Sequence, residues 1–408
     1  MYRKNNNSKS GSTRWKYVKL EDICEIKGRV GWKGYTKKDL VTSGPLALGA
    51  THINSNNRLD LSEPVYLSRE KYEESPEIMV NKGDILIVQR GSLGKVVLVD
   101  REIGDATINP SMVLLKNISI NNEYLYYFLC SEYIQRKILL EKSQTSIPMI
   151  SQEQIRKFNI YLPNLEEQEK ISEILSTWDL AIEKQEQLIE KKKEFKKGLI
   201  QRLLTGEVRF KEFNDKWKTL MIKDIADTIS ELNKSDEKLT VLSCTKYDGL
   251  VESLKYFGKQ MFSDDTSKYK KVWKNDFAYA TNHIEEGSIG VQRICDVGLV
   301  SPMYTVFRIN DEIVDTDYLF YLLKTERYIS IYKSRMSASV DRRGSLRWPE
   351  FSKIKLMLPS IHEQKKITEV LKSSDKEIEL LEKELEALKL QKKGLMQRLL
   401  TGEVRVKV

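Results

Sequence analysis

The sequence repeats one thirteen-residue phrase in its middle and near its end. "GLIQRLLTGEVRF" occupies residues 198–210, and "GLMQRLLTGEVRV" occupies residues 394–406. At the same spacing upstream, "LPNLEEQEKISEIL" from Leu162 aligns with "LPSIHEQKKITEVL" from Leu358. An internal repeat determines the architecture before any single element does, so the chain is predicted to be two copies of one unit.

Fainter similarity extends upstream of both repeated blocks, in the same order. "WKYVKLEDI" at 15–23 resembles "WKTLMIKDI" at 217–225, and "GSLG" at 91–94 resembles "GSIG" at 287–290. Each copy is therefore predicted to be a variable globular part followed by a nearly invariant segment. A chain of 408 residues is long enough for two such parts, each with its own hydrophobic core.

The charge balance indicates the kind of partner to expect. The chain carries 68 basic and 59 acidic residues, a net charge of +9. A basic excess on a soluble chain favours polyanionic partners, although charge governs association rather than fold. An ordinary lysine-rich solvated surface is the alternative explanation.

Cysteine usage and hydropathy favour a cytoplasmic protein. Cys24, Cys130, Cys244 and Cys295 are far apart and form no CxxC pair, so neither a zinc ribbon nor a disulfide framework is expected. No stretch reaches the ~20 apolar residues that a membrane-spanning helix needs. Residues 1–14 lack the apolar region of a secretory signal and are predicted to be a disordered leader.

Each repeated block carries the start and stop signals of one long helix. Asn164 with Glu167 three residues later fits a capping box, in which both side chains bind the first backbone amides. Gly206 can adopt the left-handed conformation that ends a helix. The second block has the same pattern at Ser360, Glu363 and Gly402. About forty residues without proline lie between these signals, which is roughly 60 Å of helix.

An apolar stripe along both helices predicts that they pair. Apolar residues step by three and four from Ile171 to Leu203 and again from Ile367 to Leu399, with charged residues on the other faces. Gln185, Lys192 and Glu384 interrupt the stripe. The nearest partner for each stripe is the other one, in antiparallel packing with the globular parts at opposite ends. In the alternative, each helix packs on its own globular part.

The globular parts combine β-rich and helical patterns. Runs such as "DILIV" (84–88) and "MYTVFRI" (303–309) predict strands, and "NEYLYYFLCSEYIQRKIL" (122–139) predicts amphipathic helix. Two loop-rich places recur in both halves, one after a strand and one before the long helix. They are "GDILIVQRGSLGK" (83–95) with "NDFAYATNHIEEGSIG" (275–290), and "KSQTSIPMISQEQI" (142–155) with "KSRMSASVDRRGSLRWPEF" (333–351).

These motifs together resemble the specificity (S) subunit of type I restriction-modification systems. The resemblance rests on "LPNLEEQ" and "LPSIHEQ", on the two "KKGLxQRLLTG" helix ends and on "GDIL…GSLG", and it covers the chain except for the leader. In the second half, "NDFAYATNHIEEGSIG" lacks the glycine before the aspartate and carries a longer loop. The resemblance implies an α+β fold, with two mixed α/β target-recognition domains, a long antiparallel two-helix coiled coil and an internal pseudo-two-fold repeat. The expected segments are a leader (1–14), recognition domain 1 (15–161), spacer helix 1 (162–210), recognition domain 2 (211–357) and spacer helix 2 (358–408).

The same resemblance implies a function. Each recognition domain is expected to read one half of a split target in double-stranded DNA, and the helices are expected to set the gap between the halves. Two methyltransferase (M) subunits and motor-nuclease (R) subunits are the implied partners, and they would carry adenine-N6 methylation chemistry, S-adenosylmethionine, ATP and Mg²⁺. This chain is expected to hold no catalytic residue, metal or cofactor of its own.

Two other classes of function are alternatives. A structural coiled-coil adaptor would need the helices but not two globular halves that differ in their loops. A self-contained nuclease or methyltransferase would need catalytic motifs, but the chain has no [DN]PP[YF], and "GSLGKV" does not complete a phosphate-binding GxxxxGK[ST] loop. Its three histidines, His52, His283 and His362, show no HExxH spacing.

Side chains with a defined donor and acceptor pattern at base edges are the candidates for DNA reading, because arginine pairs with guanine and asparagine or glutamine with adenine. In the first half the candidates are Gln89, Arg90, Ser92, Gln144 and Ser146, with Thr51, His52 and Asn54 as a secondary set. In the second half they are Asn282, His283, Ser288, Arg335, Ser337, Arg342, Arg343 and Arg347. For each residue the alternative is an ordinary solvated loop, and His52 and His283 also suit structural roles.

Overall fold

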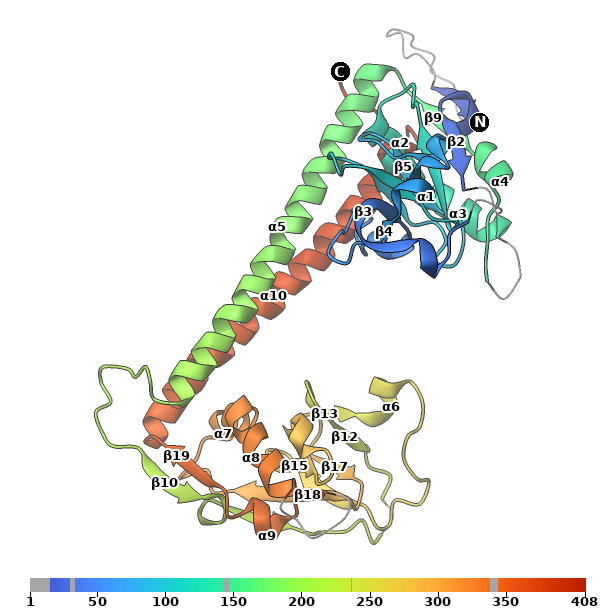
Figure 1. The fold of residues 1–408 in the computed structure, drawn as a ribbon. Coiled ribbons are helices and arrows are strands. Elements are labelled where there is room, and N and C mark those ends of the chain that lie inside the picture. The colour runs from blue at the N-terminus through green and yellow to red at the C-terminus, as the bar shows by residue number, and fades with distance from the viewer. Residues whose placement is uncertain (1–14, 30–33, 143–146, 236, 338–343) are drawn as a thin grey trace, which may run out of the picture. The chain divides into compact units, whose positions relative to one another are not determined.

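The computed structural model describes residues 15–29, 34–142, 147–235, 237–337 and 344–408, and describes Ser337 by its backbone alone (Figure 1). Contacts divide the chain into two compact units. Residues 1–186 with 383–408 form the first unit, and residues 187–382 form the second. Each unit thus combines one globular part with a length of both repeated helices.

The first unit is built on an antiparallel sheet that is apolar on both faces. Its strand order is β2 (Glu25–Gly28), β8 (Met112–Lys116), β5 (Ile85–Val88), β6 (Val96–Leu98). Ile85 and Ile87 join the core beneath the helices, and Leu86 and Val88 join a second core on the other face. Because successive strand residues face opposite ways, a sheet covered on both sides needs the continuous apolar run that "ILIV" provides.

Smaller elements complete the first unit. β4 (Tyr66–Leu67), β3 (Leu40–Leu48) and β7 (Ala106–Ile108) form a second sheet, in which β3 and β7 are parallel. β1 (Lys16–Lys19) pairs antiparallel with β9 (Asn159–Leu162). The helices are α1 (Arg69–Glu73), α2 (Asn122–Cys130), α3 (Glu132–Glu141) and α4 (Gln152–Arg156). The helical segment predicted at 122–139 is thus two helices, because Ser131 is extended between them.

The second unit repeats the main sheet of the first, while its smaller strand pairs differ. Its main sheet has the order β11 (Ala226–Ile229), β18 (Tyr304–Ile309), β15 (Phe277–Ala280), β16 (Ile289–Val291). The other strand pairs are β10 (Lys218–Met221) with β19 (Lys355–Leu358), β12 (Leu242–Thr245) with β13 (Gly249–Glu252), and β14 (Lys270–Trp273) with β17 (Val297–Val300). The helices are α6 (Ser253–Phe257), α7 (Thr316–Leu323), α8 (Glu326–Ser337) and α9 (Trp348–Phe351). The predicted internal repeat is therefore confirmed at the level of sheet order.

The two repeated blocks are long helices, as predicted. α5 (Leu165–Leu204) and α10 (Ile361–Leu400) have 40 residues each. At their starts, the Glu167 amide donates to Asn164 Oδ1 at 2.8 Å, and the second helix is capped in the same way by Ser360. Both end at a glycine with a left-handed backbone, φ 75° at Gly206 and φ 72° at Gly402.

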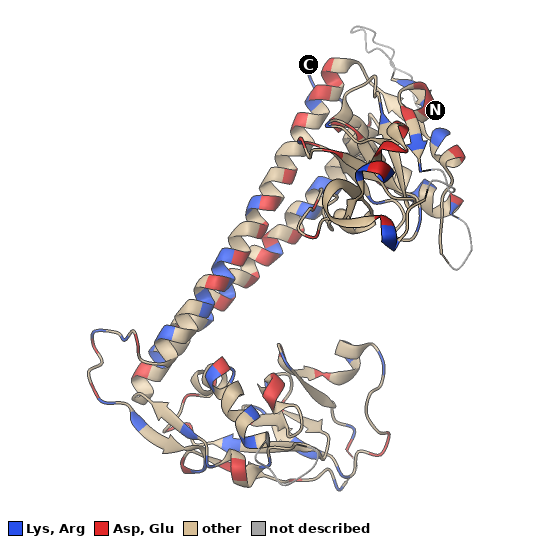
Figure 2. Cartoon of the chain, viewed as in Figure 1, with Lys and Arg blue, Asp and Glu red and all other residues tan. Residues whose placement is uncertain are grey.

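The helices pack together in antiparallel fashion in both units. In the first unit Glu186 of α5 lies 3.0 Å from Lys389 of α10, and Asp179, earlier in α5, binds Lys392, later in α10, so the two helices run in opposite directions. In the second unit Lys193 lies 2.9 Å from Glu382. Figure 2 shows basic and acidic residues interleaved along both helices, as such cross-pairing requires. The predicted antiparallel pairing is confirmed.

The polar residues that interrupt the apolar stripe make contacts between the two helices. Gln185 Nε2 donates to Glu384 Oε2 at 3.1 Å, and Lys192 forms an ion pair with Glu377. The helices also pack on the globular parts. Ile171 and Leu175 of α5 are buried in the main core of the first unit, and Ile367 and Leu371 of α10 are buried in that of the second. The two packing schemes considered for the stripe therefore coexist, each along a different part of the helices.

In each unit, a residue from one copy of the repeat binds a residue from the other copy. The buried carboxylate of Glu167, from the "EQ" of the first block, accepts two hydrogen bonds at 2.6 and 2.7 Å from Arg405 of the second phrase. Trp15 Nε1 donates to the same carboxylate at 3.2 Å. In the second unit, Glu363 of the second block binds Arg209 of the first phrase at 2.9 and 2.8 Å. Each unit therefore contains one ion pair between a glutamate of one copy and an arginine of the other.

This pairing corrects the capping-box prediction. The cap side chains bind the backbone as expected, but the carboxylates of Glu167 and Glu363 bind an arginine distant in sequence. A bidentate pair with a guanidinium is stronger than a hydrogen bond to a neutral amide. The neighbouring Gln168 accepts from the Asn121 amide at 3.0 Å and donates to Pro163 O at 2.9 Å, which ties the helix start to α2.

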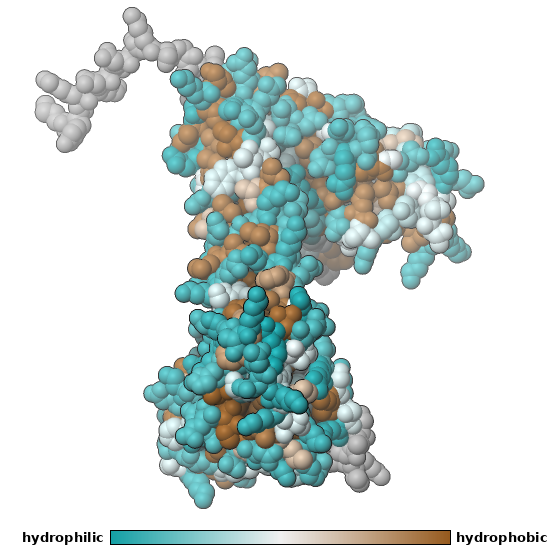
Figure 3. Space-filling model, turned by 90° about the vertical axis from the view of Figure 1, so that its left-hand side faces the viewer, coloured by the Kyte–Doolittle hydropathy of each residue, from teal (hydrophilic) through white to brown (hydrophobic). Residues whose placement is uncertain are grey.

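None of the described helices is both long enough and apolar enough to cross a membrane. On the face drawn in Figure 3, apolar residues form patches that hydrophilic residues border.

Candidate nucleic-acid interface

The two loop-rich places singled out in the first half lie against each other. Strand β5 ends at Val88, and the following residues pair with the segment that precedes α4. The Ile150 amide donates to Gln89 O at 3.0 Å, and the Gly91 amide donates to Pro148 O at 3.1 Å. Arg90 and Met149 form an isolated antiparallel bridge. Segments about sixty residues apart thus form one surface, which we name reader loop 1 (residues 89–92 with 147–150).

The second unit brings its two corresponding segments together in the same way. Strand β15 ends at Ala280, and the Leu346 amide, just before α9, donates to Thr281 O at 2.8 Å. The joined segments are named reader loop 2 (residues 281–288 with 344–347). Both surfaces follow the third strand of the main sheet and precede the last short helix, so the repeat places them at equivalent positions.

The described candidates of reader loop 1 differ in their freedom to contact a ligand. Arg90 and Ser92 are exposed. Arg90 Nη2 lies 3.4 Å from Met149 Sδ, and the guanidinium makes no ion pair within the described part of the chain. Gln89 is half-buried, and its Nε2 donates to Pro110 O at 3.0 Å. Arg90 and Ser92 are therefore better placed than Gln89 to meet a ligand.

Two of the secondary candidates in the first half, His52 and Asn54, bind the backbone of their own loop. His52 is 3 % exposed, and its Nδ1 accepts from the Gly49 amide at 3.0 Å. Asn54 Oδ1 accepts from the amides of Asn56 and Arg58 at 2.9 Å each. Thr51 is exposed. The structural role considered for His52 is the one that its contacts favour.

Two candidates of the second half are held inside the unit. Ser288 is 6 % exposed because the chain turns back at Gly287 and the Ser288 carbonyl accepts from the Ala280 amide at 3.1 Å. Arg335 lies on α8, and its Nη1 donates to Glu350 O at 2.9 Å, which holds α9. Both side chains are therefore less free to meet a ligand than the exposed candidates are.

The remaining described candidates of the second half lie on reader loop 2. Asn282 is half-buried, and Arg347 is exposed at the start of α9. His283 is exposed, and its Nδ1 lies 3.4 Å from Glu286 Oε1. Gln144, Ser146, Arg342, Arg343 and the Ser337 side chain lie outside the described residues.

The chain also carries a possible metal-binding group and four cysteine thiols. Among the described residues, one group has metal-ligand spacing: His283, Glu285 and Glu286, with ligand atoms within 4.8 Å of one another. Two of these side chains are exposed, and such acidic groups are common on protein surfaces without an ion. All four cysteines are free, and burial raises the pKa of Cys24, Cys130 and Cys244 to about 12. These thiols stay protonated and are poor nucleophiles.

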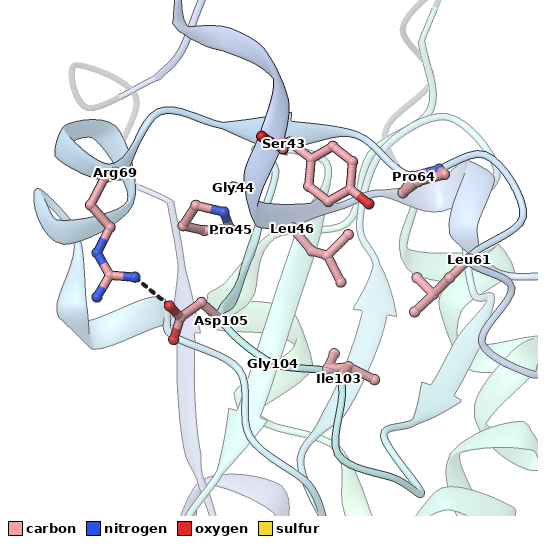
Figure 4. A pocket seen from close by; sticks show the side chains of 11 residues that line it. Ser43, Gly44, Pro45, Leu46, Leu61, Pro64, Arg69, Ile103, Gly104 and Asp105 are labelled. Carbon is pink, nitrogen blue, oxygen red and sulfur yellow. Dashed lines mark hydrogen bonds and ion pairs between the residues drawn. The ribbon is translucent and has the colours of Figure 1, made fainter.

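Two cavities of the first unit have ion pairs in their walls. A pocket of about 500 Å³ lies over β3, and Figure 4 shows Arg69 directed at Asp105 in its wall. Arg69 Nε also lies 2.7 Å from Glu73 Oε1, so the cation is neutralised within the unit. A larger, polar cleft of about 880 Å³ lies between residues 54–58 and the two long helices. Arg58 is bound there to Asp179 at 3.1 Å, and Lys392 of α10 binds the same carboxylate.

Sequence reasoning missed the side chains that hold the helix pair to each globular part. Tyr127 of α2 donates to Asp179 Oδ2 at 2.7 Å, and Lys392 of α10 binds the other oxygen. Tyr321 and Lys196 bind Asp375 in the same arrangement. Burial and the nearby Asp179 raise the pKa of Tyr127, so this hydroxyl remains a donor. The signal was available, because both aspartates and both lysines occupy matching positions in the repeat.

Comparison with known proteins agrees with the repeat. A family profile described as "Type I restriction modification DNA specificity domain" matches residues 13–191 and 214–390. The type I restriction enzyme MjaVIII specificity subunit of Methanocaldococcus jannaschii is 32% identical over 356 residues, which cover 81% of each chain. The S subunit of a type I restriction-modification system from M. genitalium has a similar fold, with TM-score 0.52, 17% identity and coverage of 97% of this chain and 98% of that one. A chain solved in work on complex assembly and conformational transition of the type I R-M system gives TM-score 0.58, 16% identity and coverage of 96% and 98%. With two matched segments, each ending in one of the paired helices, the chain belongs to the type I restriction-modification DNA specificity family.

Proposed function

We propose that each unit reads one half of a bipartite DNA target through its reader loop, and that the paired helices set the distance between the halves. One observation carries this proposal. Reader loops 1 and 2 occupy equivalent positions on two main sheets of the same strand order, but they present different residues at their surfaces. A structural adaptor would not need two similar domains whose surface loops differ in sequence. The family and the net charge of +9 favour DNA as the ligand.

The side chains of the reader loops fit base reading in different ways. The Arg90 guanidinium can donate two hydrogen bonds to the O6 and N7 of a guanine in the major groove. The amide of Asn282 can bind N6 and N7 of an adenine, and Arg347 supplies a guanidinium on reader loop 2. Phosphate contacts from nearby basic and hydroxyl side chains would position the duplex without adding sequence information.

The catalytic chemistry would belong to partner proteins. We propose that two methyltransferase subunits dock on the helices and that motor-nuclease subunits join the complex. S-adenosylmethionine, ATP and Mg²⁺ would be bound by those subunits, and this chain would bind none of them. The published work on assembly of a type I R-M system with a similar fold supports the idea of such a complex.

Selection from a random duplex library tests this proposal. The purified chain, mixed with the methyltransferase subunit of the same system, should enrich two short sequence blocks separated by an unread gap of constant length. A structural adaptor would enrich nothing, and a self-contained nuclease or methyltransferase would change the DNA without any added subunit.

Replacing Arg90 with alanine should relax the preference at one base pair of one half-site by about 1–3 kcal/mol, because a bidentate guanine contact would be lost. The change is measured by repeating the selection with the variant. Arg347→Ala is the matched control, since it lies on reader loop 2 and should affect the other half-site. Equal weakening on all sequences would instead assign Arg90 to a phosphate contact.

A further inference from the structure

A short hairpin of the second unit lies beside reader loop 2. Its strands are β12 and β13, and Lys246, Tyr247 and Asp248 form its exposed tip. Figure 1 shows the hairpin, together with α6, at the end of the unit away from β10 and β19. The Tyr247 side chain is 79 % exposed, and Lys246 Nζ lies 5.1 Å from the centroid of its ring. A large aromatic ring is thus presented to the solvent at the tip of a hairpin.

Contacts at its base hold the hairpin against reader loop 2. Lys324, directly after α7, donates to Lys246 O at 2.7 Å and to Gly287 O at 2.8 Å, so one ammonium group joins the tip to the reader loop. Gly290 of the "GSIG" motif lies so close to the hairpin that an added Cβ would meet the backbone of β13 at 2.4 Å. The hairpin therefore forms part of the same surface as reader loop 2, and Tyr247 projects from a firmly held base.

The surface around Tyr247 is aromatic and basic. Tyr256 of α6 is 51 % exposed and donates to Asp248 Oδ2 at 3.2 Å, which ties α6 to the tip. Residues 246–259 contain three lysines against two carboxylates, those of Asp248 and Glu252. The three lysines are exposed and form no ion pair with any described residue: Lys246, Lys255 and Lys259. Exposed aromatic rings among lysines are typical of surfaces that stack on bases and contact phosphates.

The first unit has a different segment at the matching place. The last strands of the two main sheets are β6 and β16, and residues 53–57 lie against β6 as the hairpin lies against β16. Lys95 Nζ donates to Ile53 O at 2.8 Å, and the Val96 amide donates to Asn57 Oδ1 at 3.4 Å. This segment reads "INSNN" and contains no aromatic residue. An effect of Tyr247 on a ligand is therefore expected in one half of the target alone.

We propose that Tyr247 is a wedge, a side chain that inserts between neighbouring base pairs, and that it unstacks one base step beside the half-site of reader loop 2. This inference rests on the proposed function, which supplies the duplex. Stacking of the tyrosine ring on the opened base offsets the loss of base stacking, and Lys246 contacts a flanking phosphate. Pyrimidine–purine steps open most easily, so the wedge adds a preference for such a step without any hydrogen bond to a base.

Fluorescence of 2-aminopurine tests the wedge, because this adenine analogue becomes brighter when it is unstacked. The full-length chain and its Tyr247→Ala variant are each bound, with the methyltransferase subunit of the same system, to the selected duplex. The analogue is moved one position at a time through the base pairs outside the two half-sites. One position beside a half-site should be several-fold brighter with the wild-type chain. Unstacking caused by the partner subunit is present in both complexes and cancels in this comparison.

Affinity and selection give two further measurements. Tyr247→Ala should bind the duplex about tenfold more weakly, and a repeated selection should lose the preference for a pyrimidine–purine step. Tyr247→Phe is the matched control. It keeps the ring, and the hydroxyl that it removes makes no hydrogen bond with the described residues, so the bright position and the affinity should both be retained. The tip is exposed, so neither variant should change the melting temperature.

Lys246→Ala separates the phosphate contact from the wedge. It should lower the salt dependence of binding by about one phosphate contact, while the bright position remains. A loss of the bright position with unchanged salt dependence would show that Lys246 orients the ring and contacts no phosphate, which would overturn that part of the proposal.

The remaining outcomes would overturn the wedge. If Tyr247→Ala matches the wild-type chain in affinity and in brightness at every position, the hairpin does not meet the DNA, and the proposed function survives. Weaker binding without a bright position would place Tyr247 against the sugar–phosphate backbone. Loss of a bound methyltransferase subunit from the variant, counted by native mass spectrometry, would make the tip a protein interface. A wild-type complex that selects no sequence would refute the proposed function itself.

Discussion

Replacing Arg209 with alanine is expected to lower the free energy of unfolding by about 3 kcal/mol, because it leaves a buried carboxylate without its partner. Glu363 is 1 % exposed and accepts both of its short hydrogen bonds from Arg209. In the second unit Trp217 Nε1 makes no hydrogen bond with any described residue, so the indole does not support the carboxylate once the arginine is removed. Urea unfolding followed by circular dichroism measures the loss, and an unchanged m-value would show that stability alone has changed.

The chain provides its own controls for this prediction. Arg202→Ala breaks an ion pair in which both side chains are more than half exposed, so it should cost less than about 0.5 kcal/mol. Arg405→Ala should cost less than Arg209→Ala, because Trp15 still donates to Glu167. Adding Glu363→Gln to Arg209→Ala should restore part of the stability by removing the buried charge. If Arg209→Ala and Arg202→Ala lowered the free energy of unfolding by the same small amount, the buried ion pair would not be what stabilises the unit.

The long helices could be predicted because their signals are local. Asn164, Gly206 and the apolar steps between them act within one or two turns, and their physics depends little on the rest of the fold. The partner of Glu167 could not be predicted in the same way. Its carboxylate had a local option, the capping box, and a distant one, Arg405, and only the folded unit brings the second within reach.

The reader loops show where sequence reasoning is weaker. The sequence places the candidate segments beside strands and helices, but no local rule predicts that the Ile150 amide donates to Gln89 O. Arg335 was assigned to a loop, whereas α8 continues to Ser337 and directs this arginine at Glu350 O. Ser288 was assigned to the surface, but the left-handed turn at Gly287 carries it into the sheet. Such placements depend on where an element ends, which local composition determines poorly.

Inserting seven residues into both long helices is expected to lengthen the unread gap of the DNA target by about 3 bp. Seven residues add about 10 Å of helix, and one base pair spans about 3.4 Å. A heptad rotates the helix face by only about 20°, so the apolar stripe stays in place. The hydrogen bond between Gln185 and Glu384 marks the same level on the two helices, so the insertions belong directly after Gln185 and directly before Glu384.

Because each reader loop lies in a different unit and both helices contribute to both units, a longer helix pair should change the gap and leave the half-sites unchanged. Selection from a library with variable gaps measures both quantities at once. Three extra base pairs also turn one half-site by about 100° around the duplex, so binding should weaken while the preferred gap grows. A heptad in α5 alone is the control, because it shifts pairs such as Lys193 with Glu382 out of register and should lower stability without creating a new preferred gap. New half-site sequences with the original gap would refute the proposal that the helices measure distance.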